Sequence, residues 1–414
     1  MSSQAISSRP LSPAVSFVAV AVIAWLFPAA SSAPSPLYVV YQQEWHFSAG
    51  TLTTIFAVYV AGLVATLLVA GALSDHIGRR PVLAAAIGLE VVSLILFVLA
   101  GDVATLMLAR VLQGIATGAA ITTISATLVD LNPPHAPGRA GLINGVAPTG
   151  GLALGALGCG VLVQYAPFPT RLVYVIFLAG MVLSAVAVAV MPETATRKPG
   201  AAASLVPRLG VPHHIRADFT ALIPIQVATW ALGGLYLSLG PSVAAGVFGL
   251  TNHLIGGLVV GVLGGSSAVT AVALRKRGHA RAVLDVGAIL LAAGSAVTLA
   301  GLITGAVIPA TVGTVIGGIG FGAAVLGSFG AVIRMSGPAE RGELFAVAYT
   351  IAYLALSIPA VAAGIASNGV GLRTTAIVYS AALIVLCGIT FVAQRLRLRS
   401  RFSEPRPSGG AAAG

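Results

Sequence analysis

Between two long apolar runs the chain reads Gly71-Ala72-Leu73-Ser74-Asp75-His76-Ile77-Gly78-Arg79-Arg80-Pro81-Val82-Leu83. The run from Thr51 to Ala72 leads into this stretch, and the run from Val82 to Ala100 leads out of it. Only 8% of all residues are charged, so a loop with an aspartate and two adjacent arginines stands out. A loop this polar must lie in water, whereas the runs on both sides have the composition of segments that lie in a membrane.

The composition excludes an ordinary soluble protein, in which about a quarter of the residues are charged. Of the 414 residues 57% are hydrophobic, and the mean hydropathy is +0.99. A bilayer core of about 30 Å needs about 20 helical residues, and apolar runs of this length recur along the whole chain. We therefore predict an all-α membrane protein with twelve transmembrane helices and no soluble domain. The spans are expected at 14–37, 50–72, 81–100, 104–128, 140–163, 171–190, 219–239, 253–274, 282–303, 308–333, 343–366 and 372–394.

Short internal matches indicate that the chain is a duplicated unit. Gly114-Ile-Ala-Thr-Gly118 in the fourth predicted span resembles Gly318-Ile-Gly-Phe-Gly322 in the tenth. Arg139-Ala-Gly-Leu142 before the fifth span resembles Arg341-Gly-Glu-Leu344 before the eleventh. The charged loop itself has a degraded copy between Arg275 and Leu284. Repeats about 200 residues apart, with the substrate site between the repeated halves, are typical of transporters.

The longest polar interruption, from Pro192 to Arg216, separates the two repeats. We predict a six-helix N-terminal half at 1–190, a cytoplasmic central loop at 191–218 and a pseudo-symmetric six-helix C-terminal half at 219–394. A basic cytoplasmic tail is expected at 395–414.

The net charge of +11 is explained by membrane orientation, because cytoplasmic loops collect Lys and Arg. Most of the basic residues fall on one side of the predicted spans, which places that side and both termini in the cytoplasm. Because orientation accounts for the positive charge, we expect no nucleic-acid partner. The preference for Arg over Lys, with abundant Ala and Gly, suggests a bacterial inner membrane. The two cysteines, Cys159 and Cys387, lie in apolar spans and predict no disulfide framework or metal site.

Three motifs resemble one transporter family. Gly71-x-Leu73-x-Asp75-x-x-Gly78-Arg79-Arg80 is similar to the signature loop of the major facilitator superfamily, and lies between the second and third of twelve spans as in that family. Arg110-x-x-Gln113-Gly114 in the fourth span resembles a motif of its proton-coupled members. Pro148-Thr-Gly150-Gly151 in the fifth span resembles the glycine-proline motif of drug/proton antiporters, with Ala147 where glycine usually precedes the proline.

The resemblance implies that the loop is a conformational latch between the halves, formed by Gly71, Asp75, Gly78, Arg79 and Arg80. The two glycines permit a tight reversal and a close approach of helices. Asp75 is then expected to face the positive N-terminal end of the eleventh span, near Arg341. Arg79, whose planar guanidinium group holds its hydrogen-bond donors in a fixed arrangement, is expected to pair with Asp130 at the end of the fourth span. The alternative is a solvated turn whose arginines serve only membrane orientation.

Arg110 lies inside the fourth span, where a charge costs about 3 kcal/mol and usually faces a cavity or a partner. Arg110, Gln113 and Thr117 share one helix face, which we expect to line the central cavity. The alternative is an arginine that extends to the outer headgroups.

Glu90 in the third span lies at a depth in the membrane similar to that of Arg110. Burial favours its protonated form and a nearby arginine favours its ionised form, so we predict that Glu90 and Arg110 take part in proton coupling. A structural hydrogen bond between helices is the alternative.

Several polar and aromatic positions are candidates for substrate contact. Gln226 and Trp230 share a face of the seventh span, and Tyr349 and Tyr353 share a face of the eleventh. Thr117 and Asn144 are the candidates from the N-terminal half. Aromatic side chains in an apolar pocket with few polar groups suit a small amphipathic molecule. Packing at helix interfaces would also account for each of these residues.

The sequence thus predicts a secondary active transporter and no enzyme. The chain contains no G-x-x-x-x-G-K-[ST] phosphate loop, so ATP is not the expected energy source. We expect the proton gradient to supply the energy, and we expect no bound cofactor. Efflux of a small amphipathic compound by a monomer is the leading hypothesis. Proton-coupled uptake of a metabolite is the alternative, and a non-transporting membrane sensor or scaffold is a third.

The degraded copy of the loop predicts an asymmetry between the halves, because Arg275 stands about where an aspartate matching Asp75 is expected. Asp75→Asn should impair transport while the protein still inserts, and Arg275→Gln should matter far less. Transport by both variants, measured at equal expression, tests this prediction. An equal loss in the two variants would contradict it.

Overall fold

The computed structural model describes residues 11–207, 209–275, 280–337 and 340–403, without the side chains of 280, 281 and 394–403. The described residues fold into helices and connecting segments, with no strand among them. The basic tail beyond 403 and residues 276–279 of the loop copy lie outside the described part. The helices are α1 (Pro13–Ser32), α2 (Pro34–Trp45), α3 (Ala49–Ala70), α4 (Ser74–Ile77), α5 (Arg79–Leu99), α6 (Val103–Asp130), α7 (Arg139–Tyr165), α8 (Leu172–Val190), α9 (Ala201–Ser204), α10 (His213–Thr220), α11 (Ile223–Ser238), α12 (Gly240–Phe248), α13 (His253–Leu274), α14 (Ala280–Thr304), α15 (Val307–Met335), α16 (Arg341–Val370) and α17 (Leu372–Ser403).

The predicted membrane-protein fold is confirmed. Within the described ranges, eleven helical segments are long and apolar enough to cross a membrane. The pair α10 and α11, bent by 50°, gives a twelfth if the two helices form one span. Large apolar side chains such as Leu183 and Ile308 are 70% and 78% exposed, which suits a surface in contact with lipid.

The first and seventh spans differ most from the ranges expected from the sequence. The first is α1 followed by α2, so it continues to Trp45 instead of ending near residue 37. It is interrupted at Ala33, before Pro34, because proline cannot donate the backbone hydrogen bond of a continuous helix. The seventh is divided into α10 and α11, and α10 begins at His213, inside the range predicted as the central loop.

Each half has its own apolar core, and a third cluster lies between the halves. The first core is formed mainly by residues of α1 to α8, and the second by residues of α10 to α17. The third contains Tyr59, Val60 and Val64 of α3, Ala156 of α7 and Leu356 of α16. The two halves therefore meet along an apolar interface, as the predicted two-half arrangement requires.

Small residues bring the halves together at two helix pairs, α7 with α13 and α3 with α16. A Cβ added to Gly160 would lie 3.1 Å from the Cα of Gly257, so the backbones of α7 and α13 nearly touch. A Cβ on Gly364 of α16 would clash with the side chain of Thr53 of α3. Close packing of this kind drives helix association where no hydrophobic effect is available.

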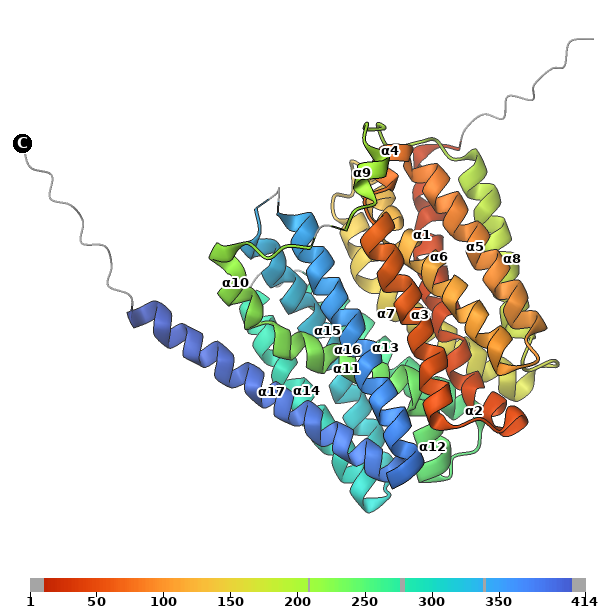
Figure 1. Cartoon of the computed structure of the whole chain (residues 1–414), viewed down its shortest axis with the longest axis vertical. Helices are drawn as coiled ribbons and strands as arrows, with labels where there is room; N and C mark the ends of the chain where they lie inside the picture. Colours follow the sequence, from red (N-terminus) through yellow and green to blue (C-terminus); the bar gives the residue numbers. More distant parts are fainter. Residues whose placement is uncertain (1–10, 208, 276–279, 338–339, 404–414) are drawn as a thin grey trace, which may run out of the picture.

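The halves converge at the end that holds α2 and α12 and diverge toward the end that holds α4 and α10 (Figure 1). At the converging end, the Ser242 hydroxyl of α12 lies 3.3 Å from the amide oxygen of Gln42 of α2. Helix α1 begins and α17 ends on the side of α4 and α10, which is the side that we predict to be cytoplasmic (Figure 1).

The α7–α13 contact predicts a difference between two glycines of one helix. Gly257→Ala should lower the free energy of unfolding by about 1–3 kcal/mol, because its Cβ would lie 2.5 Å from the Ala156 carbonyl oxygen. Gly265→Ala is the matched control, since a Cβ there meets nothing within 4 Å. Thermal denaturation of the purified variants in detergent checks this prediction. A Gly257→Ala protein as stable as Gly265→Ala would contradict the close approach.

Candidate functional site

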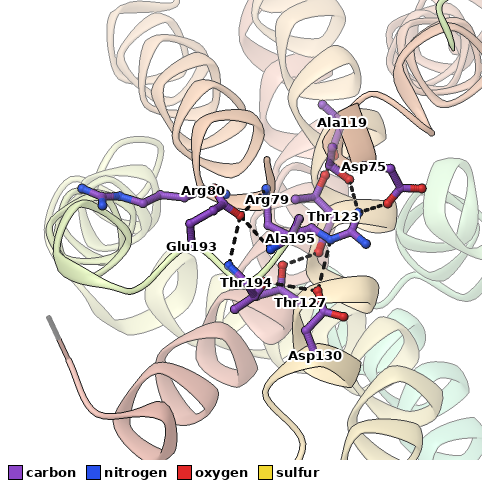
Figure 2. A network of polar contacts seen from close by, with 11 residues as sticks. Asp75, Arg79, Arg80, Ala119, Thr123, Thr127, Asp130, Glu193, Thr194 and Ala195 are labelled. Atoms are coloured by element: carbon purple, nitrogen blue, oxygen red, sulfur yellow. Dashed lines mark hydrogen bonds and ion pairs between the residues drawn. The ribbon is translucent and has the colours of Figure 1, made fainter. Parts of the chain in front are cut away.

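The charged loop folds around Arg79 (Figure 2). Arg79 forms an ion pair with Asp75, and its Nη1 donates a hydrogen bond of 2.6 Å to the hydroxyl of Ser74. Its Nε lies 3.3 Å from Oδ2 of Asp130, so the predicted pairing between Arg79 and the end of α6 is present. One guanidinium thus joins α4, the start of α5 and the end of α6.

Gly71 and Gly78 bound the short helix α4 within this loop. Gly78 has a φ of +108°, which side chains other than glycine rarely adopt, and a Cβ there would lie 2.5 Å from a carboxylate oxygen of Glu193. A Cβ on Gly71 would clash with the carbonyl oxygen of Leu67. The positive φ of Gly78 thus provides the predicted tight reversal, whereas Gly71, with a φ of −59°, continues the helical conformation at the end of α3.

Glu193, which follows α8, is a residue that the sequence analysis did not single out. Its carboxylate accepts hydrogen bonds from the backbone amides of Arg79 at 2.8 Å and Arg80 at 3.2 Å, at the start of α5 (Figure 2). It also accepts from the amides of Thr194 and Ala195, both at 3.1 Å. A carboxylate is well placed there, because the first amides of a helix lack partners and carry a partial positive charge.

Asp75 does not make the contact that the sequence led us to expect. The ion pair described for Asp75 joins it to Arg79 within the N-terminal half, and not to the start of α16 near Arg341. The central linker also lies against this loop: the amide of Lys198 donates to the carbonyl of Asp75 at 3.3 Å, and the His76 Nδ1 lies 3.1 Å from the carbonyl oxygen of Pro199. The two halves diverge at this end (Figure 1), which explains why a contact across them is replaced by one within a half.

Deep in the N-terminal half, Gln113 connects Arg110 to Glu90. Arg110 Nη1 donates to the Gln113 side-chain oxygen at 2.7 Å, and Gln113 Nε2 donates to Glu90 Oε1 at 3.0 Å. All three side chains are fully buried. The expected closeness of Glu90 and Arg110 is therefore present, but a neutral amide lies between the two charged groups.

The break between α1 and α2 supplies acceptors for this network. Pro34 has no N–H, so the carbonyl of Ala30, one turn earlier, has no helical partner. Gln113 Nε2 lies 3.3 Å from that carbonyl oxygen, and Arg110 Nη1 donates to the neighbouring Ser31 carbonyl at 2.9 Å. The proline of one helix thus leaves a free carbonyl acceptor for polar side chains of another helix.

In this structure the Arg110 side chain is fully buried among partners, so it neither extends to the headgroups nor lines an open cavity. Its guanidinium carbon lies 4.8 Å from the centre of the Tyr59 ring and 5.6 Å from that of Tyr38, within the range of cation–π contacts. Thr117 on the same face is also buried, 3.5 Å from the Ser31 hydroxyl. A Cβ on Gly114 would clash with the backbone of α3, which shows that this face is packed against α1 and α3.

The polar network is only partly satisfied. Within the described residues, Arg110 Nε and Nη2, Glu90 Oε2 and the Tyr38 hydroxyl have no hydrogen-bond partner. A buried polar group without a partner costs about 1–3 kcal/mol. Buried polar groups are usually hydrogen-bonded, so several unpartnered atoms in one place call for a specific explanation.

The glycine-proline motif of α7 packs against α1. Pro148 lies inside α7, and a Cβ on Gly150 would meet the Trp25 ring at 2.5 Å. A Cβ on Gly151 would lie 2.8 Å from the Trp25 carbonyl oxygen. These two glycines therefore allow α7 and α1 to approach closely.

In the C-terminal half the structure brings three of the substrate-contact candidates together. Trp230 of α11 lies 5.5 Å from Tyr353 of α16, measured between ring centres, and Tyr353 lies 6.3 Å from Tyr349. Gln226 lies one turn before Trp230, and both its amide oxygen and its amide nitrogen lack a partner within the described residues. Asn144 is elsewhere, with its amide nitrogen 3.4 Å from the carbonyl of Ser125.

Tyr59 connects the polar network with these aromatic residues. One face of its ring covers Arg110, and the same side chain belongs to the apolar cluster between the halves. Trp230 and Tyr353 pack against that cluster from the other half. The Tyr59 ring therefore contacts both the buried Arg110 and the interface between the halves. Within the described residues, no group of three or more His, Cys, Asp or Glu side chains could hold a metal ion.

Comparisons with known proteins agree with this architecture. The sequence profile of the Major Facilitator Superfamily matches residues 20–360. Among solved structures, a bacterial homolog of the human lysosomal transporter Spinster, in an inward-facing and unoccupied conformation, is 16% identical. Its TM-score is 0.75, over 96% of this chain and 99% of that one. A POT family transporter in complex with 5-aminolevulinic acid is 15% identical, with a TM-score of 0.72 over 97% of this chain and 98% of that one. The human organic anion transporter MFSD10 (TETRAN) is 18% identical, with a TM-score of 0.63 over 92% of this chain and 100% of that one.

The role of Glu193 can be tested by hydrogen exchange. Glu193→Ala should speed exchange of the Arg79 and Arg80 amides by about tenfold, because both lose a charged acceptor that is partly screened by water. Mass spectrometry of a peptide that spans 78–82 measures this change. Glu44→Ala removes an exposed carboxylate of α2 and is the control. Unchanged exchange in Glu193→Ala would show that the carboxylate does not hold the start of α5.

Proposed function

Because the chain belongs to the Major Facilitator Superfamily, we propose that it is a proton-coupled secondary transporter that exports a small amphipathic compound by alternating access. The observation that carries this proposal is the buried chain of contacts from Glu90 through Gln113 to Arg110. The proton gradient is the energy source, no cofactor takes part, and the transporter works as a monomer. It lies in the bacterial inner membrane with both termini in the cytoplasm.

Glu90 is the proposed proton carrier, and Arg110 and Gln113 sense its charge. An ionised Glu90 accepts the Gln113 amide hydrogen bond and supplies a negative charge near Arg110. A protonated Glu90 carries a donor of its own and leaves Arg110 without a counter-charge, so the same side chains must find new partners. The Ala30 carbonyl freed by Pro34 and the unpartnered guanidinium nitrogens offer such partners.

The compound is proposed to bind where the halves meet. Gln226, Trp230, Tyr349 and Tyr353 form the C-terminal side of this site. The candidates from the N-terminal half, Thr117 and Asn144, are in contact with Ser31 and Ser125 in this structure and would have to turn toward the compound. The shared cluster that holds Tyr59, Trp230 and Tyr353 supports a direct link between the proton site and the substrate site. The packing of Pro148, Gly150 and Gly151 on α1 is proposed to transmit the same motion to α7.

The loop network is proposed to act as the latch. With the halves apart at this end, Arg79 neutralises both Asp75 and Asp130, while Gly71 and Gly78 set the geometry and Arg80 donates to the carbonyl of Ala189. When the halves close, Asp75 leaves Arg79 for the amides at the start of α16, where a helix dipole favours an anion. The exchange keeps every charge paired in both states, which is what a reversible latch requires.

The direction of transport distinguishes the proposed export from proton-coupled uptake. A growth-inhibition screen with a broad panel of amphipathic compounds, comparing wild type with Arg110→Ala and Asp75→Asn, identifies the compound. Its flux is then measured in inverted and right-side-out vesicles under an imposed proton gradient. Accumulation in inverted vesicles supports export, and accumulation in right-side-out vesicles supports uptake. Binding without flux would favour a sensor.

Glu90→Gln is the sharpest variant for the coupling mechanism. The amide oxygen can still accept from Gln113, so the fold should persist, but the side chain no longer carries a proton. We expect compound-dependent proton movement to fall to the level of vesicles without protein, while exchange of labelled for unlabelled compound continues. A pH-sensitive dye inside the vesicles measures the proton movement. Glu44→Gln, an exposed carboxylate of α2, is the control, and proton movement unchanged by Glu90→Gln would exclude the proposed role.

A further inference from the structure

Aromatic side chains of α11, α15 and α16 form a continuous cluster in the C-terminal half. The ring centre of Trp230 lies 5.5 Å from that of Tyr353 and 6.0 Å from that of Phe321. The ring centre of Tyr353 lies 6.3 Å from that of Tyr349, which lies 4.9 Å from that of Phe329. Of these five side chains only Phe321 is fully buried. The cluster therefore has ring surfaces that other protein atoms do not cover.

The register between α11 and α16 places Gln226 at the level of this cluster. A Cβ on Gly234 would clash with the carbonyl oxygen of Leu356, and one turn earlier in both helices Trp230 meets its partner ring on α16. The two helices therefore run in the same direction. Gln226 lies one turn before Trp230, and Tyr349 lies one turn before the partner ring. The same register thus sets Gln226 opposite Tyr349.

Gln226 has hydrogen-bonding capacity that the protein leaves unused. The side chain is 3% exposed, and within the described residues neither its amide oxygen nor its amide nitrogen has a partner. The indole nitrogen of Trp230, on the same helix face, is also without one in that part of the chain. Unsatisfied groups are costly at such burial. One molecule satisfies both ends of the amide when it carries a donor and an acceptor side by side.

The cluster extends from the interface between the halves toward the end where the halves diverge. Trp230 and Tyr353 pack against the apolar residues between the halves. Tyr349 is nearer the start of α16 and Phe329 nearer the end of α15, which both lie on the side of α4 and α10 (Figure 1). A compound that enters between the halves from this side meets the partly exposed rings first. It reaches the buried amide of Gln226 when the Tyr349 ring turns aside.

The composition of the same helices indicates the charge of the compound. Residues 223–274, 286–333 and 344–372 contain no Asp, Glu, Lys or Arg. A charged compound beside the aromatic cluster would therefore meet no counter-charge from these segments, and an unpaired charge within the membrane is costly. A neutral compound needs only ring contacts and the hydrogen bonds that Gln226 and Trp230 can offer.

We infer that Gln226 and the rings of Trp230, Tyr349 and Tyr353 bind a neutral, planar aromatic compound whose ring carries an N–H next to a C=O. The flat ring packs against the aromatic side chains. The Gln226 oxygen accepts from the N–H, and its nitrogen donates to the C=O, in the two-bond manner by which glutamine pairs with the edge of adenine. This inference rests on the proposed function, since it names the class of exported compound.

Equilibrium dialysis of the full-length protein in phosphatidylcholine nanodiscs tests the inference without any transport. The probe is carbostyril, a neutral bicyclic lactam with adjacent N–H and C=O groups. The comparison compound is N-methylcarbostyril, which keeps the rings and the carbonyl but lacks the N–H. Empty nanodiscs at the same lipid concentration measure the amount of each compound that dissolves in the bilayer. The wild-type protein should bind carbostyril about tenfold more tightly than the methylated compound.

Three variants locate the binding. Gln226→Leu should weaken carbostyril binding about tenfold and change that of N-methylcarbostyril by less than about threefold, because the methylated compound cannot form both hydrogen bonds. Retained binding of the methylated compound also shows that this variant is folded. Tyr349→Leu removes a ring and should weaken both compounds by a similar factor, about fivefold. Gln43→Leu, at an exposed position of α2, is the matched control and should alter neither.

Each outcome decides the inference. Equal affinity of the wild type for the two compounds, or an equal effect of Gln226→Leu on both, would show that the amide does not recognise the N–H and C=O edge. Either result overturns the inference, as does binding that never exceeds that of empty nanodiscs. The dialysis uses no proton gradient, so a failure of the proposed transport function, seen as no flux in the vesicle assay, would leave the binding pattern as it is. Lactam binding without flux and flux without lactam binding are therefore distinguishable.

Discussion

The structure depends on one constraint: the Arg110 guanidinium is buried within the membrane-spanning part of the chain, where an unpaired charge is costly. The surrounding helices are arranged to reduce that cost. The break between α1 and α2 turns carbonyls toward it, Tyr38 and Tyr59 cover it with ring faces, and Gln113 connects it to Glu90. Glycines such as Gly114 bring α6 close enough to α3 for these contacts to form.

The same constraint explains why the two halves differ in character. The N-terminal half carries the buried charges and the loop built on Arg79. The C-terminal half offers aromatic rings and neutral polar groups in its membrane segments. The interface between them is apolar and held by small residues at α7–α13 and α3–α16. The buried charges Glu90 and Arg110 both lie in the N-terminal half, so sliding or opening of this apolar interface would not separate them.

Much of the fold followed from the sequence, because apolar runs of span length leave few alternatives. The pairing of Arg79 with Asp130 and the closeness of Glu90 to Arg110 also followed, since they depend on position along antiparallel spans. The orientation of side chains did not: Arg110 was expected to face a cavity and is instead packed against Tyr38 and Tyr59. Glu193 was missed because its partners are backbone amides, which carry no signal in the residue pattern. The missing N–H of Pro34 was a sign in the sequence that a carbonyl of α1 would need a side-chain donor.

The position of Glu193 has a consequence for the order of assembly during synthesis. The loop from Gly71 to Leu83 leaves the ribosome more than a hundred residues before the carboxylate that fixes the start of α5. The geometry of that loop is therefore complete only after the sixth span has been made and its end has returned to the side of the membrane that holds α4. Because protein domains generally fold as units from the N-terminus onward, the first half closes on itself at this point, before α11 is inserted. The newborn chain thus gains a finished six-helix unit against which the second half assembles.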